Sequence, residues 1–287
     1  MLFGKAESKN QTVELYSLDG NGNFQKNEPI YTYWWDGVPN FGDWIGPYLL
    51  SKISNRPLIN VRGQKRTQAL FSVGSILEHI NENYQQAEVW GSGLIQVPHR
   101  KRIKKLKKYI SQVHAVRGEY TYQQLTQNVG LNVPKVFGDP ALLMPRFYQP
   151  QNLVQDKICI CPHFSHYQYF SEIEGSDQFN IIDVRNSVQN VVDQIVSSKV
   201  CISSSLHGLI IAQAYGVPWV WLDLNQKSLD DFKFEDFFST LKNKENIYRK
   251  KFLVEQINER SLLSLSQYAG LFEQKYSNQT LLDAYPY

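Results

Sequence analysis

Short apolar segments alternate along the chain with segments whose apolar residues recur at helical spacing. Strands are expected in a first group at 30–35, 70–73, 88–90, 113–116 and 136–137, and in a second group at 157–161, 180–183, 199–203 and 219–222. Helices are expected at 44–53, 120–128, 188–197, 206–215 and in the tail from about 255 to 282. Strands that alternate with helices predict parallel sheets wrapped by helices.

The segment between the two groups, 140–150, contains Pro140, Pro145 and Pro150. Proline is poorly tolerated inside helices and strands, so this segment is expected to be a linker. A chain of 287 residues is long enough for two modest α/β domains. The predicted organisation is therefore a first domain over 1–150 and a second over 151–287.

Several functional classes are disfavoured by composition. No apolar run approaches the roughly 20 residues of a membrane-spanning helix, and the first residues do not resemble a secretory signal, so a cytoplasmic protein is expected. Cys159, Cys161 and Cys201 fall in apolar strand patterns. Alternate residues of a strand point to opposite faces, which suits buried structural thiols better than a metal site. No metal or other cofactor is expected.

Positive charge is concentrated in one segment. The net charge is +3, whereas residues 100–108 alone contain seven lysines and arginines, with Ile103, Leu106 and Ile110 at helical spacing. A helix with a solvated basic face is the ordinary interpretation. Contact with anionic lipid at the inner face of the cell membrane is the functional one. No nucleic-acid-binding module accompanies the segment, so nucleic acid is not an expected partner.

Several predicted strands stop at glycine or serine just before a helix. Gly74-Ser75 and Gly91-Ser92 are two such turns, where backbone N–H groups and a helix N-terminus could hold an anion. Each glycine could equally serve only the tight turn. None of these turns matches a Walker motif or a complete dinucleotide-binding fingerprint.

The third turn of this kind carries a histidine. Ser203-Ser204-Ser205 follows a strand, and Leu206-His207-Gly208 opens an apolar helix. Hydroxyls and N–H groups at that position suit a bound anion, and an anion would favour a protonated imidazole that acts as general acid. A histidine that only caps the helix fits the spacing equally well.

The ordered set of motifs resembles the polysaccharide pyruvyltransferase family, particularly its shorter exopolysaccharide-type members. The motifs, in chain order, are Asn40-Phe41-Gly42-Asp43, Gly74-Ser75-Ile76-Leu77, Gly91-Ser92-Gly93, Val116-Arg117-Gly118 with Thr121, Gly138-Asp139-Pro140-Ala141, Ile182-Asp183, and Ser205-Leu206-His207-Gly208 with Gly216-Val217-Pro218. Each motif alone is weak, but the series in order is specific.

The resemblance implies an α/β fold of two Rossmann-like domains facing a cleft, as in GT-B glycosyltransferases. It also implies phosphoenolpyruvate as donor and a sugar diol, in a lipid-linked oligosaccharide or other glycan, as acceptor. Within it, His207 matches the general acid, Asp43 the N-terminal acidic residue, and Arg117 and Lys227 donor-binding cations. Some relatives carry an arginine where this chain has Ser205. Either another cation, such as Arg185, Lys227 or Arg146, supplies that charge, or donor use differs.

Ketal formation from an enol phosphate requires a proton for carbon 3, an activated sugar hydroxyl and cations around the phosphate and carboxylate. We expect His207 to deliver the proton and Asp43 to orient or deprotonate the hydroxyl. The expected donor-binding residues are Arg117, Lys227, Ser203, Ser204, Ser205, Leu206, Gly208, Gly74, Ser75, Gly91 and Ser92. The expected acceptor-binding residues are Asn40, Trp44 and His163; core packing is the alternative for the aromatic residues near Asn40.

Two other functions fit part of the pattern. A GT-B glycosyltransferase would use a nucleotide sugar, with Asp183 or Asp223 contacting the ribose. A non-enzymatic protein that binds carbohydrate or lipid during capsule assembly is the other alternative.

Overall fold

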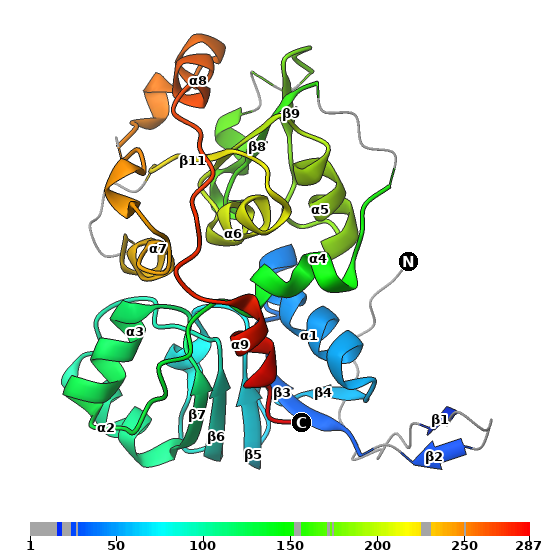
Figure 1. The fold of residues 1–287 in the computed structure, drawn as a ribbon, viewed down its shortest axis with the longest axis vertical. Helices are drawn as coiled ribbons and strands as arrows, with labels where there is room; N and C mark the ends of the chain where they lie inside the picture. Colours follow the sequence, from blue (N-terminus) through cyan, green and yellow to red (C-terminus); the bar gives the residue numbers. More distant parts are fainter. Residues whose placement is uncertain are drawn as a thin grey trace.

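The computed structural model describes residues 16–18, 24–26, 28–151, 156–170, 173, 175–224, 231–249 and 251–287. It contains two parallel sheets with helices around them, as Figure 1 shows. A small antiparallel hairpin, β1 (Tyr16–Leu18) and β2 (Phe24–Lys26), precedes them. No helix in the described part of the chain is both long enough and apolar enough to cross a membrane.

The first sheet has five parallel strands in the order β4-β3-β5-β6-β7. They are β3 (Ile30–Tyr33), β4 (Leu58–Asn60), β5 (Arg66–Phe71), β6 (Tyr84–Trp90) and β7 (Ile110–Ala115). Its connections contain α1 (Phe41–Ser54), the 3₁₀ turn η1 (Ile76–His79) and α2 (Arg100–Tyr109). After β7 come α3 (Glu119–Gln123) and the π-helical turn η2 (Gln124–Val129).

The second sheet has four parallel strands in the order β11-β10-β8-β9. They are β8 (Ile158–Cys161), β9 (Phe179–Ile181), β10 (Val200–Ser203) and β11 (Trp219–Trp221). Around them lie η4 (Phe164–Phe170), α5 (Val188–Val196), α6 (Leu206–Tyr215), α7 (Asp231–Phe238), η5 (Lys244–Asn246), η6 (Val254–Gln256) and α8 (Glu259–Ser266). Cys159 and Cys201 are register partners, and all three cysteines are buried and unoxidised, as expected.

Both sheets are doubly wound in the same sense. In each, the first strand lies between the second and the third, so the strand order reverses beside the first strand. In sheets of this type ligands bind beyond the carboxyl ends of the strands at that reversal. The expected positions are the ends of β3 and β5 in the first sheet and of β8 and β10 in the second.

The two sheets are joined by a shared apolar core. Phe41, Ile45 and Leu49 of α1 pack in one buried cluster with Leu209 and Ile210 of α6. Such a continuous core fixes one sheet against the other, because any opening would expose its apolar surface. The parallel α/β architecture is confirmed; a GT-B arrangement of two domains about a cleft stays a prediction.

The expected linker at 140–150 is in fact packed between the sheets. It forms η3 (Pro140–Leu143) and α4 (Met144–Phe147), and its residues 140–144 are buried. Asp139 caps the turn, and Pro140 occupies the first helical position, where a missing N–H costs nothing. Pro140 and Pro145 therefore lie at helix starts, whereas Pro150 follows α4. In Figure 1, α4 and α1 lie between the two sheets.

The prediction of a helical tail over 255–282 is wrong in its middle. After α8 the chain is extended, and Gly270 and Gln274 bridge to Trp219 and Leu241 before α9 (Asn278–Asp283) begins. Helix α9 returns to the first sheet (Figure 1). There Trp90 Nε1 donates to the Leu281 carbonyl at 2.9 Å. The expected strand at 136–137 is reduced to a single bridge between Val116 and Phe137.

Candidate active site

The carboxyl ends of both sheets meet at His207, in the first turn of α6. A Cβ atom added to Gly42 at the start of α1 would lie 2.4 Å from the His207 Nδ1 atom. One added to Gly74, which follows β5 with φ +100°, would lie 3.8 Å from His207 Cε1. Glycine at these positions lets the first sheet approach the imidazole closely. The sequence predicted this convergence for His207, Asp43 and Gly74.

The imidazole faces a carboxylate that the sequence analysis left without a role. His207 Nε2 lies 3.8 Å from Asp139 Oδ2, too far for a hydrogen bond. Both atoms are buried and have no hydrogen-bond partner among the described residues, although Asp139 Oδ1 accepts from the Ala141 N–H. An unsatisfied buried polar atom costs about 1–3 kcal/mol, so such a pair calls for an explanation beyond stability.

Asp43 provides a second carboxylate beside the imidazole. It lies in the first turn of α1, and burial raises the pKa of its carboxyl from 3.8 to about 6, against opposing contributions from His207, Asn40 and Lys233. A carboxylate whose pKa approaches neutrality is a better proton acceptor than an exposed one and is still ionised at pH 7. This property suits general-base chemistry.

Two helix N-termini border the same space. The Asn40 side chain caps α1 by accepting from the Gly42 N–H at 3.1 Å. Ser205 begins α6 without a side-chain cap. The first N–H groups of a helix have no partner within it, and the helix dipole makes that end favourable for anions. At α1 these N–H groups are already engaged, because those of Phe41, Gly42 and Asp43 donate to Val184 and Asn40. The start of α6 is therefore the helix end that can hold an anion.

The loop after β8 adds two further imidazoles. Ser204 Oγ accepts from the His163 backbone N–H at 3.0 Å and lies 3.1 Å from His166 Nδ1. Burial, with Lys233 and His166 nearby, lowers the pKa of His163 to about 4, so this ring is neutral at pH 7. The acceptor-binding role of His163 stays a prediction.

Lys233 is a cation that the sequence analysis missed, because α7 was not predicted. It is close enough to lower the pKa of the Asp43 carboxyl and the pKa of the His163 imidazole. The buried phenylalanines at 234, 237 and 238 recur at helical spacing, and this pattern could have predicted α7. The expected Lys227 lies outside the described residues.

Arg117 is enclosed within the protein. Its side chain has no exposed surface, and its Nε donates to Asp236 Oδ2 of α7 at 2.9 Å. Its other nitrogens donate to Ser75 Oγ at 2.5 Å and to the Leu94 carbonyl at 2.6 Å. Asp236 also accepts from the Thr121 N–H and hydroxyl. Direct contact between Arg117 and a donor would require movement of α7, and that contact stays a prediction.

The other expected donor residues divide into two groups by their surroundings. Ser203 Oγ donates to the Cys161 carbonyl at 2.7 Å and accepts from the Ser205 N–H, so its hydroxyl supports the turn. Ser92 Oγ donates to the Gly74 carbonyl at 2.9 Å and supports that turn in the same way. Leu206, Gly208 and Gly91 are buried and pack at or behind these turns. Ser204 instead contacts the His166 imidazole, and Ser75 contacts Arg117.

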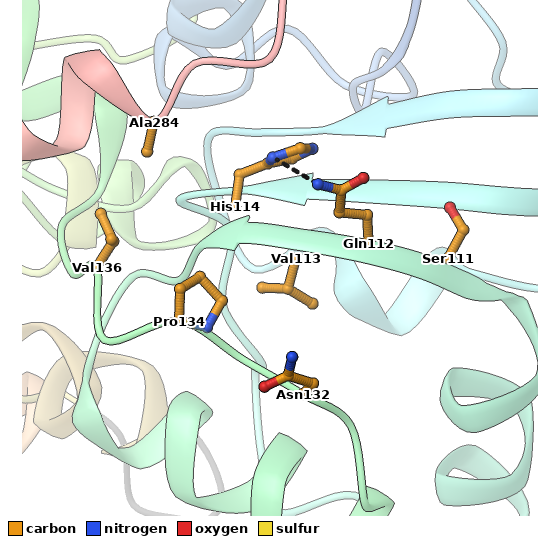
Figure 2. A pocket seen from close by; sticks show the side chains of 8 residues that line it. All are labelled: Ser111, Gln112, Val113, His114, Asn132, Pro134, Val136 and Ala284. Carbon is orange, nitrogen blue, oxygen red and sulfur yellow. Dashed lines mark hydrogen bonds between the residues drawn. The ribbon is translucent and has the colours of Figure 1, made fainter.

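A groove of about 870 Å³ lies next to the α1 N-terminus. We call it the α1–α5 groove; Pro39, Trp44 and Tyr48 form one wall, and Arg185, Asn186 and Gln189 form the other. Trp44, the residue that follows Asp43 in the helix, is 44% exposed. A second cavity of about 620 Å³ lies beside β7 and includes His114 and Gln112 (Figure 2), but none of the expected site residues lines it.

The basic segment forms α2 as expected. Lys105 and Arg102 pair with Glu82 and Glu78 at 3.1 Å and 3.4 Å, and the other cations of the helix, Arg100, Lys101, Lys104, Lys107 and Lys108, are exposed. Contact with an anionic membrane stays a prediction.

In the described part of the chain, no three histidine, cysteine or acidic side chains gather as metal ligands.

Comparison with known proteins supports a specific family. The model of the polysaccharide pyruvyl transferase family matches residues 26–226. An uncharacterized protein of Acanthamoeba polyphaga mimivirus is 28% identical over 231 residues, which cover 77% of each chain. The succinoglycan biosynthesis protein ExoV of Rhizobium meliloti is 36% identical over 62 residues, 22% of this chain and 19% of that protein.

Among solved structures, an uncharacterized protein of Klebsiella pneumoniae shares 15% identity and superposes with a TM-score of 0.48, covering 74% of this chain and 87% of that one. The family match alone spans most of the chain and includes every motif from the Asn-x-Gly-Asp element at 40–43 to the Ser-Leu-His-Gly element at 205–208. On that match, this chain belongs to the polysaccharide pyruvyl transferase family.

Proposed function

We propose that this protein transfers a pyruvyl group from phosphoenolpyruvate to two hydroxyls of one sugar in a lipid-linked polysaccharide precursor, forming a ketal. The observation that carries the proposal is the pair of facing, unsatisfied atoms His207 Nε2 and Asp139 Oδ2, set at the N-terminus of α6. A proton donor, a carboxylate and an anion-binding environment are thus within one small space. Family membership supplies the pyruvyl chemistry.

His207 serves as the general acid of the first step. Its imidazolium gives a proton to carbon 3 of the enol, and positive charge develops at carbon 2. Asp139, with no exposed surface, stabilises the imidazolium before transfer. The His207 side chain is only 12% exposed, which limits loss of the proton to water.

Asp43 accepts the proton of the first attacking hydroxyl. That oxygen bonds to carbon 2; the carbon–oxygen bond to phosphate then breaks, and a neighbouring hydroxyl attacks the same carbon. The two sugar hydroxyls release two protons. One replaces the proton that His207 gave to carbon 3, and the other leaves with inorganic phosphate. The raised pKa of Asp43, about 6, fits a group that takes up and releases a proton near neutral pH.

The donor carries about three negative charges, which need several partners. The N–H groups at the start of α6, the Gly74-Ser75 turn and Lys233 are the groups of the described chain that meet this need from different sides. Lys227, outside the described residues, remains part of the proposal. Arg117 acts from beneath, through its hydrogen bond to Ser75.

The proposal is tested by ligand binding and by product. Phosphoenolpyruvate is expected to raise the thermal midpoint, because a ligand that binds the folded state stabilises it. With a lipid-linked oligosaccharide, the mixture is expected to release phosphate and yield a glycan heavier by one pyruvyl ketal.

The matched control is 2-phospholactate, which carries the same charges but has no double bond to protonate. It is expected to bind without reaction. Stabilisation by UDP-sugars and not by phosphoenolpyruvate would instead indicate a glycosyltransferase and would overturn the proposal.

A further inference from the structure

We propose that the α1–α5 groove binds the acceptor glycan over more than one sugar unit and delivers its terminal sugar to Asp43. This inference rests on the proposed function, since it identifies where the acceptor of that reaction lies. It concerns a separate surface from the donor site, and it can therefore fail or hold independently.

The position of the groove is fixed by the junction of the two sheets. The Phe41 N–H donates to the Val184 carbonyl at 2.7 Å, which holds the segment after β9 against the start of α1. Residues 185–189 of that segment and the first turns of α1 then form opposite walls. Ser187 caps α5 through the Asn190 N–H, so the second wall is also held in place.

The groove and the reaction site meet at consecutive residues of α1. Asp43 is turned toward His207 and Lys233, whereas Trp44, one residue on, lines the groove. Consecutive residues of a helix point about 100° apart, so one turn of α1 serves both spaces. A sugar stacked on Trp44 would therefore lie within one residue of Asp43 along the helix.

The lining suits a carbohydrate. Trp44 and Tyr48 provide aromatic surface, and the Trp44 ring lies 5.9 Å from that of Trp34. The exposed amides of Asn186 and Gln189 both donate and accept hydrogen bonds, which matches the dual character of sugar hydroxyls. A mainly apolar groove with a few polar groups is typical of ligand sites.

The size of the groove argues for several sugar units. About 870 Å³ is near the upper end of the ~300–1,000 Å³ found for ligand pockets and exceeds the volume of a single sugar ring. The Arg185 guanidinium, paired with Asp183 at 2.7 Å, lies 5.1 Å from the Tyr167 ring and extends that wall toward the loop after β8. An oligosaccharide fills such a space, whereas a monosaccharide does not.

The test is direct binding of soluble oligosaccharides, in the absence of any donor, by saturation-transfer NMR. A panel of neutral and acidic bacterial glycans, each from monosaccharide to tetrasaccharide, is used with the full chain. We expect affinity to rise with length and then level off. Trp44→Ala is expected to weaken the binding roughly tenfold, because the indole contributes a large contact area. Trp44→Phe should retain most of it.

Tyr268→Ala is the matched control, because Tyr268 is an aromatic residue with 54% exposure outside the groove. It should bind like the wild type. Equal binding by the wild type and Trp44→Ala, equal affinity for monosaccharide and tetrasaccharide, or no binding of any glycan in the panel would each overturn the groove assignment. Length-dependent binding that Trp44→Ala weakens, in a protein that never uses phosphoenolpyruvate, would support the groove and reject only the proposed reaction.

If the protein is active, the kinetics separate the two sites further. Trp44→Ala is expected to raise the KM for the acceptor roughly tenfold and to leave the KM for phosphoenolpyruvate within about twofold. An unchanged KM for the acceptor would contradict the proposal. A rise in both KM values would indicate a general distortion of α1 and would count equally against it.

Discussion

Two charged clusters join the same pair of sheets and differ in how their polar atoms are satisfied. In the first, Arg117 and Asp236 are fully buried, and Asp236 Oδ2 lies 2.9 Å from two guanidinium nitrogens. Thr121 and Ser75 complete that network. In the second, His207 Nε2 and Asp139 Oδ2 face each other at 3.8 Å with no hydrogen bond to any described residue.

The contrast distinguishes a cluster whose polar atoms are satisfied from the cluster to which we assign the proposed reaction. A buried ion pair is tolerated when hydrogen bonds satisfy both partners, and breaking it leaves an uncompensated charge. Buried atoms without partners are rare in folded proteins, and each calls for an explanation such as a catalytic role, strain or a bound water or ion. The Arg117–Asp236 cluster is of the first kind, and the His207–Asp139 pair is of the second.

The largest expected effect is the loss of activity on changing His207. His207→Gln removes the proposed acid, and general acid catalysis contributes typically 10²–10⁴-fold to a rate. The thermal midpoint should stay about the same, since the glutamine amide also places a polar group opposite Asp139. His114→Gln, in the cavity beside β7, is the matched control and should keep full activity. Substantial activity in His207→Gln would show that another group supplies the proton.

A change in the Arg117–Asp236 cluster is expected to lower stability, whereas a change of His207 is expected to lower activity. Asp236→Ala leaves Arg117 buried without its counter-ion and is expected to lower the free energy of unfolding by about 3–5 kcal/mol, measured by urea denaturation. The double variant Arg117→Met with Asp236→Ala should recover part of that loss, because no unpaired charge remains. A stable Asp236→Ala protein with impaired phosphoenolpyruvate binding would instead favour direct donor contact by Arg117.

Elements whose contacts are local were predictable from the sequence. Helix α6 has the bounds expected from its apolar spacing, 206–215, and each strand group was found because buried parallel strands are continuous apolar runs. The meeting of Asp43 and His207 was also predicted, although through the family resemblance rather than through periodicity. The ends of parallel strands are where such residues gather in this fold.

Elements defined by distant contacts were not predictable. The proline segment 140–150 was expected to be a linker, but residues 140–144 are buried through contacts with α1 and α6. Asp139 appeared in a motif without a role, because its partner His207 is 68 residues away in sequence and adjacent only in the folded chain. The return of α9 to Trp90 likewise depends on a contact between the chain's end and the first sheet.

The smallest expected effect is on the stability of the folded protein, which depends on the ionisation of the buried Asp43 carboxyl. Because its pKa is raised from 3.8 to about 6, the folded protein holds a proton that the unfolded chain has lost between these pH values, so stability falls as pH rises through that window. Asp43→Asn should therefore be more stable at pH 7, by about 3 kcal/mol at most. In the wild type, kcat/KM should rise with pH through about 6 as the carboxylate forms, and Asp43→Asn should lose both this dependence and most of its activity. A variant that is more stable and still retains the same acidic limb would assign that limb to another group and remove Asp43 from the reaction.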